Sequence, residues 1–341
     1  MFDLNNITRA NIRELKPYSS ARDEFSSSAE IFLDANENPY GDLNRYPDPY
    51  QRELKLVIKE YSALDPENIF VGNGSDEIID LLFRVFCTPS KDKVLTFVPT
   101  YGMYDVVADI NDIKMIKINL NDDFDIDYKS VESIISDPNL KIILICSPNN
   151  PTGNCLNSKC IERILNSFNG IVLVDEAYID FCDSKSFINR IVEFPNLIVS
   201  QTMSKAWGLA SARIGLAFAN SDLIALLNKV KPPYNVSGLN QNAAIKAIQN
   251  YDQFMENKQR ILEEKNKLYS SLQTLKTVKK IYPSEANFFL VEMVDADQVY
   301  NTLVNQKIIV RNRNKVVKNC IRITVGTAEE NQQLIQTLKS I

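Results

Sequence analysis

Short apolar runs alternate with segments of helical spacing along most of the chain. Apolar runs of four to eight residues are typical of buried strands, and apolar residues three and four apart are typical of helices. The predicted strands are 31–33, 69–71, 94–98, 115–118, 141–146, 171–174, 197–199 and 213–219. The predicted helices are 50–61, 75–86, one from 103, one through 131–135, and 158–168. This alternation predicts a largely parallel sheet with helices on both faces.

The pattern changes after residue 219. Helices are expected from 222 to about 275, and the last of them interleaves apolar positions with Glu and Lys, as expected of a bridge to a second unit. Beyond it, strands are predicted at 287–291, 308–310 and 320–325, and helices near 296–305 and from 328. We therefore predict three parts: an N-terminal arm with part of the small domain at 1–45, a large α/β domain at 46–250, and a small α+β domain at 251–341.

Composition narrows the class of protein. The chain has 341 residues, 45% of them apolar, and a formal net charge of −5, which fits a globular protein and argues against nucleic acid as its partner. No apolar run reaches the roughly 18 residues of a membrane helix, and the N-terminus lacks a secretory pattern. The six cysteines include no Cys-x-x-Cys pair, so we expect a cytoplasmic protein without a zinc or redox motif.

The chain contains no histidine. Catalysis by Ser-His-Asp or Cys-His and metal sites with histidine ligands are therefore excluded. Any acid or base in the reaction must be Lys, Tyr, Cys or a carboxylate, and we expect no metal.

Polar motifs follow three consecutive predicted strands. They are Ser-Pro-Asn-Asn-Pro-Thr-Gly at 147–153, Asp-Glu-Ala-Tyr at 175–178, and the segment 200–215, which contains Lys205. Ligands of open parallel sheets lie outside the carboxyl ends of the strands, so these motifs should meet in one crevice. Each motif also has a structural interpretation: the first as a turn, Asp175 as a helix cap, and Lys205 as a surface lysine. Their coincidence favours a shared site.

The residue types of these motifs suit pyridoxal phosphate. A carboxylate beside the pyridine nitrogen keeps it protonated, so that the ring withdraws electrons from the reacting carbon, and Asp175 fits this role. Asn150 and Tyr178 would hydrogen-bond the phenolic oxygen of the ring. Lys205 would form a Schiff base with the cofactor and later act as the base, since no histidine is present for that step.

A phosphate group needs an anion site of its own. Gly74, Ser75 and Asp76 open a strongly apolar predicted helix, whose free backbone N–H groups would bind an anion. In the alternative, Ser75 only caps the helix and the acids complement its dipole. Further side-chain donors would come from the lysine segment: Thr202, Ser204 and Arg213. Tyr101 could stack on the pyridine ring or be an ordinary core aromatic.

Six motifs, in this order, resemble those of the histidinol-phosphate aminotransferases, a fold-type-I family of pyridoxal phosphate enzymes. They are Gly-Asn-Gly-Ser-Asp-Glu, Pro-Thr-Tyr-Gly-Met-Tyr, Ser-Pro-Asn-Asn-Pro-Thr-Gly, Asp-Glu-Ala-Tyr, Ser-Lys-Ala and Cys-Ile-Arg-Ile-Thr-Val-Gly-Thr. The cofactor motifs alone indicate only the aminotransferase superfamily. The narrower resemblance rests on 17–22, 44–47 and 320–327. It implies an α/β fold with a large, mostly parallel α/β/α sheet domain and a smaller α+β domain.

The resemblance also implies an activity and an assembly. The expected reaction interconverts L-histidinol phosphate plus 2-oxoglutarate and imidazole-acetol phosphate plus L-glutamate, in histidine biosynthesis. A homodimer with shared active sites is implied, in which Tyr46 reaches the cofactor phosphate of the partner subunit. Arg322, Arg311 and Tyr18 would hold the anionic end of the substrate. Arg313, in contrast, is expected to form a surface salt bridge.

Other functions remain open at this point. An aromatic amino-acid transaminase or a threonine-phosphate decarboxylase of the same superfamily would share the cofactor residues. A non-catalytic pyridoxal phosphate sensor fused to a DNA-binding module is disfavoured by the acidic charge and by the lack of an N-terminal helix-turn-helix. A binding module without cofactor would leave Lys205, Asp175 and Asn150 unexplained.

Overall fold

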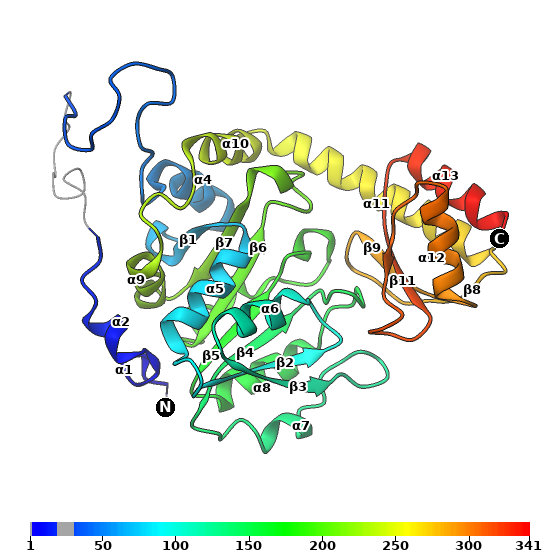
Figure 1. The fold of residues 1–341 in the computed structure, drawn as a ribbon, viewed down its shortest axis with the longest axis horizontal. Coiled ribbons are helices and arrows are strands. Elements are labelled where there is room, and N and C mark those ends of the chain that lie inside the picture. The colour runs from blue at the N-terminus through cyan, green and yellow to red at the C-terminus, as the bar shows by residue number, and fades with distance from the viewer. Residues whose placement is uncertain (1, 19–30) are drawn as a thin grey trace.

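A computed structural model describes residues 2–18 and 31–341, which build two sheets and the helices that cover them (Figure 1). The strands of the larger sheet lie in the order β1-β7-β6-β5-β4-β2-β3. Their bounds are β1 Ile69–Asn73, β2 Lys93–Val98, β3 Lys114–Asn119, β4 Leu140–Cys146, β5 Ile171–Asp175, β6 Leu197–Thr202 and β7 Ile214–Ala219.

All strand pairs of this sheet are parallel except the two that β7 makes, with β6 and with β1. The central strands β4 to β7 are apolar and almost fully buried, because helices cover both of their faces. The largely parallel sheet predicted from the alternating pattern is thus confirmed. The carboxyl ends of the parallel strands and the start of β7 lie at one edge of the sheet.

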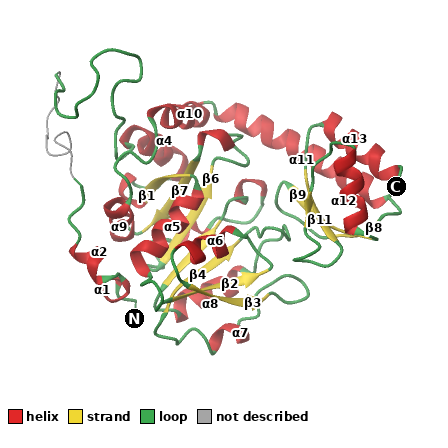
Figure 2. Ribbon diagram, viewed as in Figure 1, coloured by secondary structure: helices red, strands yellow, loops and turns green. Residues whose placement is uncertain are grey.

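The helices form a layer on each face of the larger sheet (Figure 2). One apolar core joins the sheet to α2 (Ala10–Glu14), α5 (Ser75–Phe86), α6 (Met103–Ile110) and α9 (Ser221–Val230). The other joins it to α4 (Arg52–Ser62), α7 (Lys129–Glu132), α8 (Ser158–Ser167) and α10 (Gly238–Gln249). A short α1 (Leu4–Ile7) precedes α2, and single turns of 3₁₀ helix lie at 66–68, 179–181, 187–190 and 210–212.

The smaller sheet is antiparallel and has the order β10-β11-β9-β8. Its strands are β8 Val278–Ile281, β9 Phe288–Met293, β10 Arg311–Asn312 and β11 Cys320–Thr324. One face packs on α11 (Tyr251–Gln273), α12 (Ala296–Asn305) and α13 (Ala328–Lys339). Helix α11 runs from α10 to this sheet (Figure 1), as its charged, amphipathic sequence predicted.

Two strand predictions are wrong, and one strand was missed. Residues 31–33 form no strand, and Ile31 and Leu33 are 78% and 92% exposed, because this apolar run pairs with no described strand. Residues 308–310 precede a strand instead of forming one, since pairing with β11 begins at Arg311. Strand β8 was missed because two lysines stand at its centre. The predicted domain boundaries stay a prediction.

No described helix is long and apolar enough to cross a membrane.

Candidate active site

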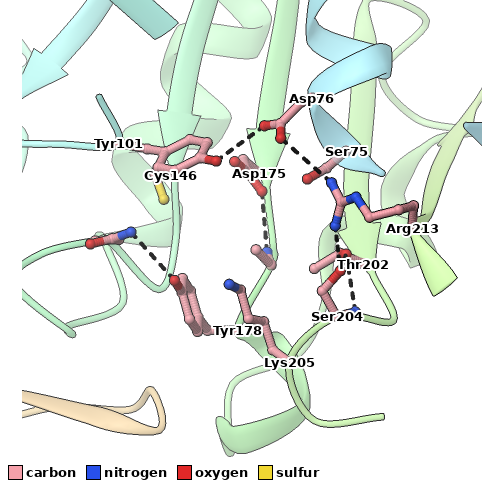
Figure 3. Close-up of a pocket in the computed structure, with 12 residues that line it drawn as sticks. Ser75, Asp76, Tyr101, Cys146, Asp175, Tyr178, Thr202, Ser204, Lys205 and Arg213 are labelled. Atoms are coloured by element: carbon pink, nitrogen blue, oxygen red, sulfur yellow. Dashed lines mark hydrogen bonds and ion pairs between the residues drawn. The ribbon is translucent and has the colours of Figure 1, made fainter. Parts of the chain in front are cut away.

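A cavity opens at the carboxyl edge of the larger sheet (Figure 3). Its lining includes ten of the residues predicted from sequence: Ser75, Asp76, Tyr101, Asn150, Asp175, Tyr178, Thr202, Ser204, Lys205 and Arg213. Cys146 and Ala177 complete the lining. The three strand-end motifs, each of which is separated from the next by 21 residues in the sequence, therefore meet in one place.

Asp175 ends β5 and is buried at the base of the cavity. Its carboxylate accepts hydrogen bonds from the Tyr104 hydroxyl at 2.9 Å and from the Ala177 amide at 3.2 Å. Burial raises the pKa of Asp175, while these two donors oppose the rise. A buried carboxylate aimed into a cavity gains from a cationic partner, which is what a protonated pyridine nitrogen provides.

Tyr104 is a site residue that the sequence analysis missed. It lies in the first turn of α6 and is buried. Its hydroxyl bonds to Asp175 and its ring packs edge-on against Tyr101, and both of these residues line the cavity. An apolar helix pattern predicts a core aromatic at this position and gives no sign of the hydroxyl's role. The only available signal was its place in the motif that contains Tyr101.

Asn150 and Tyr178 lie next to each other in the cavity lining. The Asn150 amide donates to the Tyr178 hydroxyl at 3.3 Å, and its carbonyl oxygen accepts from the Arg322 guanidinium. Burial raises the pKa of Tyr178, so its hydroxyl keeps its proton at neutral pH. The pair thus offers one amide and one hydroxyl donor to an oxygen in the cavity.

Lys205 points its amine into the cavity, 5.7 Å from the centre of the Tyr178 ring (Figure 3). The residue is exposed, yet enough protein surrounds the amine for desolvation to lower its pKa, and the nearby Arg322 lowers it further. A lowered pKa increases the fraction of neutral amine, which is the nucleophilic form.

The first turn of α5 forms an anion cradle, which we define as Gly74, Ser75 and the side chains around them. Gly74 is the N-cap residue, has a φ of 78°, and provides no side-chain cap. Ser75 is therefore the first helical residue, and the alternative in which it caps the helix is wrong. The Gly74 N–H already donates to the carbonyl oxygens of Gly72 and Arg213, so the N–H groups that can bind an anion begin at Ser75.

Side chains from the lysine segment surround the anion cradle. Arg213 donates to Ser204 at 3.3 Å and lies 3.7 Å from the Asp76 carboxylate. Thr202 and Ser204 are joined at 3.0 Å. Gly215 in β7 lets the chain approach closely, because a Cβ there would overlap the backbone of Gly74 and Ser75. These features fit a phosphate group held by backbone amides, hydroxyls and a guanidinium.

The donor set as a whole fits pyridoxal phosphate. The cavity combines a nucleophilic amine for an aldehyde, a buried carboxylate for a pyridinium nitrogen, two donors for a phenolic oxygen and an anion cradle for a phosphate. Tyr101, held at 3.1 Å by Asp76, contributes a ring to the wall of the same cavity.

Some of the predicted site residues do not line the cavity of their own chain. Tyr46 is 50% exposed and stacks on Tyr234 with ring centres 4.4 Å apart, away from the cavity lining. Tyr18 is 68% exposed, and the rest of its motif, from Ser19 onward, falls outside the described residues. Arg311 is exposed on β10, whereas Arg322 reaches the cavity through Asn150.

Comparisons with known proteins give a consistent result. Residues 21–338 match the profile of the family "Aminotransferase class I and II". The chain is 48% identical to the histidinol-phosphate aminotransferase of Cytophaga hutchinsonii over 346 residues, which cover 99% of each chain. The crystal structure of the histidinol-phosphate aminotransferase from Clostridium acetobutylicum has a TM-score of 0.80 and 25% identity, covering 87% of this chain and 90% of that one.

A second solved structure shares the fold. It is the histidinol-phosphate aminotransferase from Sinorhizobium meliloti in complex with pyridoxal-5'-phosphate, with a TM-score of 0.78 and 22% identity, covering 88% of this chain and 83% of that one.

Proposed function

Because the chain belongs to the class I and II aminotransferases, a family that depends on pyridoxal phosphate, we propose that it exchanges the amino group between L-histidinol phosphate and 2-oxoglutarate. The products would be imidazole-acetol phosphate and L-glutamate, in a step of histidine biosynthesis. The observation that carries this proposal is the 48% identity, over 99% of both chains, to a relative named for that substrate. The cavity supports it with every group that amino transfer requires.

Bound pyridoxal phosphate supplies an aldehyde that takes up the amino group and a ring that withdraws electrons from the carbon losing a proton. The chain's own groups then have distinct tasks. The Nζ of Lys205 would attach the cofactor and, once released, move the proton at the amino-bearing carbon of the substrate. Asp175 would hold the pyridine nitrogen in its protonated form.

Orientation would come from the remaining cavity residues. Asn150 and Tyr178 would fix the phenolic oxygen of the ring, and their mutual hydrogen bond keeps both donors in place. The anion cradle would hold the cofactor phosphate and thereby the angle of the ring. Arg322, which already bonds to Asn150, would bind the anionic end of the amino-acid substrate beside the reacting atoms.

We further propose a homodimer in which Tyr46 of the partner subunit completes the anion cradle. Within one chain Tyr46 lies half-exposed on Tyr234, beside a groove formed by residues 35–47 and 234–242, so its hydroxyl would be available to a second chain. Tyr18 is likewise exposed and would act on the substrate only in such an assembly. The cytoplasmic location stays a prediction.

A single-turnover absorbance experiment tests the proposed reaction. The purified holoenzyme is mixed with histidinol phosphate without keto acid, and the band of the protein-bound cofactor is followed. We expect conversion to the pyridoxamine form, and reversal by 2-oxoglutarate. Lys205→Ala should show neither change while keeping its circular dichroism spectrum, and wild-type turnover by that variant would refute the role of Lys205.

The same experiment separates the alternatives. Conversion by phenylalanine or tyrosine, with no response to histidinol phosphate, would indicate an aromatic amino-acid transaminase. Release of carbon dioxide without consumption of a keto acid would indicate a decarboxylase. A protein that binds no pyridoxal phosphate at all would contradict the interpretation of the cavity itself.

A further inference from the structure

The hairpin of β10 and β11 places three arginines on one face. Arg311 pairs directly with Arg322, and opposed residues in an antiparallel pair share a face. The pairing continues beyond β10, because the amide of Arg313 donates to the Cys320 carbonyl at 2.9 Å. Side chains alternate along a strand, so Arg313 lies on the same face as Arg311.

Contacts of the alternate residues support this assignment. Asn312 and Asn314 both donate to the Asp297 carboxylate at the start of α12, at 2.7 and 2.8 Å. Ile321 belongs to the apolar core that joins the smaller sheet to its helices. The face that carries the arginines is therefore the one turned away from those helices.

The arginine face borders the cavity of the larger sheet. Arg322 bonds to Asn150, and its guanidinium lies 5.1 Å from the centre of the Phe288 ring. Phe288 in turn packs edge-on against Tyr178, with ring centres 5.2 Å apart.

The three arginines carry positive charge without a countercharge. Within the described chain none of them forms an ion pair, and Glu292, which shares their face opposite Cys320, does not pair with them. The Nε atoms of Arg313 and Arg322 are buried and lack any hydrogen-bond partner. Burial, and then Arg322 and Arg311, lower the pKa of Arg313. Arg313 therefore does not form the expected surface salt bridge among these residues; it is an unsatisfied donor in a cationic cluster.

We propose that Arg313 is a third anion-binding residue of the substrate site, and that the cluster it completes favours a substrate ending in a phosphate monoester over one ending in a carboxylate. One guanidinium satisfies the two oxygens and single charge of a carboxylate. A phosphate monoester has three terminal oxygens and close to two charges at neutral pH, which calls for more donors and more positive charge. This inference rests on the proposed function, and it adds a residue that discriminates between the two amino donors.

The test measures the two half-reactions separately in the holoenzyme. Dissociation constants for histidinol phosphate and for glutamate are obtained from the cofactor absorbance of wild type, Arg313→Gln and Lys318→Gln. Lys318→Gln removes one positive charge from the same hairpin at an exposed position and serves as the matched control. Loss of charge-assisted hydrogen bonds predicts about 10- to 100-fold weaker binding of histidinol phosphate by Arg313→Gln. Glutamate binding should change by less than about threefold, within the spread of a neutral surface substitution.

Each outcome decides the proposal. Unchanged binding of histidinol phosphate by Arg313→Gln, equal weakening for both amino donors, or equal weakening by Lys318→Gln would overturn it. Arg313→Lys, which keeps the charge but loses the fork of donors, should fall between wild type and Arg313→Gln, and it provides the same comparison if the glutamine variant does not fold. A wild-type enzyme that ignores histidinol phosphate would instead contradict the proposed function, irrespective of the Arg313 variants.

Discussion

Gly215→Ala probes how closely the chain must approach at the anion cradle. The residue lies in β7, directly beside the first turn of α5. An added methyl group would overlap the backbone of Gly74 and the amide nitrogen of Ser75. Backbone atoms cannot rotate away as a side chain can, so β7 and the start of α5 would have to separate.

Gly215→Ala should change both the free energy of unfolding and the affinity for pyridoxal phosphate. Overpacking a well-packed site costs about 1–3 kcal/mol in the free energy of unfolding, and we expect the upper end because only backbone can give way. Separation would also misplace the amide donors of the cradle. Losing the equivalent of one charge-assisted hydrogen bond, about 1.5–3 kcal/mol, would raise the dissociation constant of pyridoxal phosphate about 10- to 100-fold.

The assay combines urea denaturation of the apoprotein with a fluorescence titration by pyridoxal phosphate. Gly102→Ala is the matched control, since a methyl there meets no atom within 4 Å and its φ of −68° suits alanine. That control should be neutral or more stable by about 0.4–1 kcal/mol, with unchanged affinity. If Gly215→Ala behaved like Gly102→Ala in both measurements, the close approach would not be needed and the reasoning would be refuted.

Two further predictions follow from buried charges. Burial and the nearby Lys231 lower the pKa of Lys55 from 10.5 to about 8, so between these values the unfolded chain binds more protons and stability rises with pH. Lys55→Met should remove that rise and increase the free energy of unfolding at pH 7 by about 1–3 kcal/mol. Urea denaturation of both proteins at pH 7 and at pH 10 measures this, and a variant that is less stable than wild type at pH 7 would contradict it. Asp175→Asn should retain pyridoxal phosphate but lose at least about 100-fold in the rate of the half-reaction, because the ring nitrogen loses its charged partner. An unchanged rate would reject that role for Asp175.

Site residues could be predicted from the sequence where a polar residue of suitable chemistry follows a predicted strand. Asp175 directly follows the apolar run 171–174, and Lys205 lies six residues after the run 197–199. The rule that ligands lie at the carboxyl ends of parallel strands places both in the crevice. Helix α5 was predicted with its observed bounds because Gly74 and the polar residues 75–77 directly precede its apolar periodicity, which begins at Ile78.

Other features could not be predicted, because they depend on contacts between segments that are distant in the sequence. Tyr104 looks like a core residue until the distance to Asp175 is known. Arg313 differs from Arg311 and Arg322 only in sequence context, and its side of the hairpin follows from the register of β10 on β11. Strand β8 carries two consecutive lysines, so its β-structure comes from pairing with β9 and not from its own composition.

The pairing of β1 with β7 has a consequence for synthesis of the protein on the ribosome. In the described sheet β1 has β7 as its only neighbour, and Ile69 meets Phe218. At about 5–20 residues per second, the growing chain waits roughly 7–30 s between making the two strands. Throughout that interval an apolar strand edge is open to other nascent chains. The anion cradle is incomplete until β7 has emerged. Premature termination before Gly215 should therefore give products that aggregate, and added pyridoxal phosphate should not prevent their aggregation.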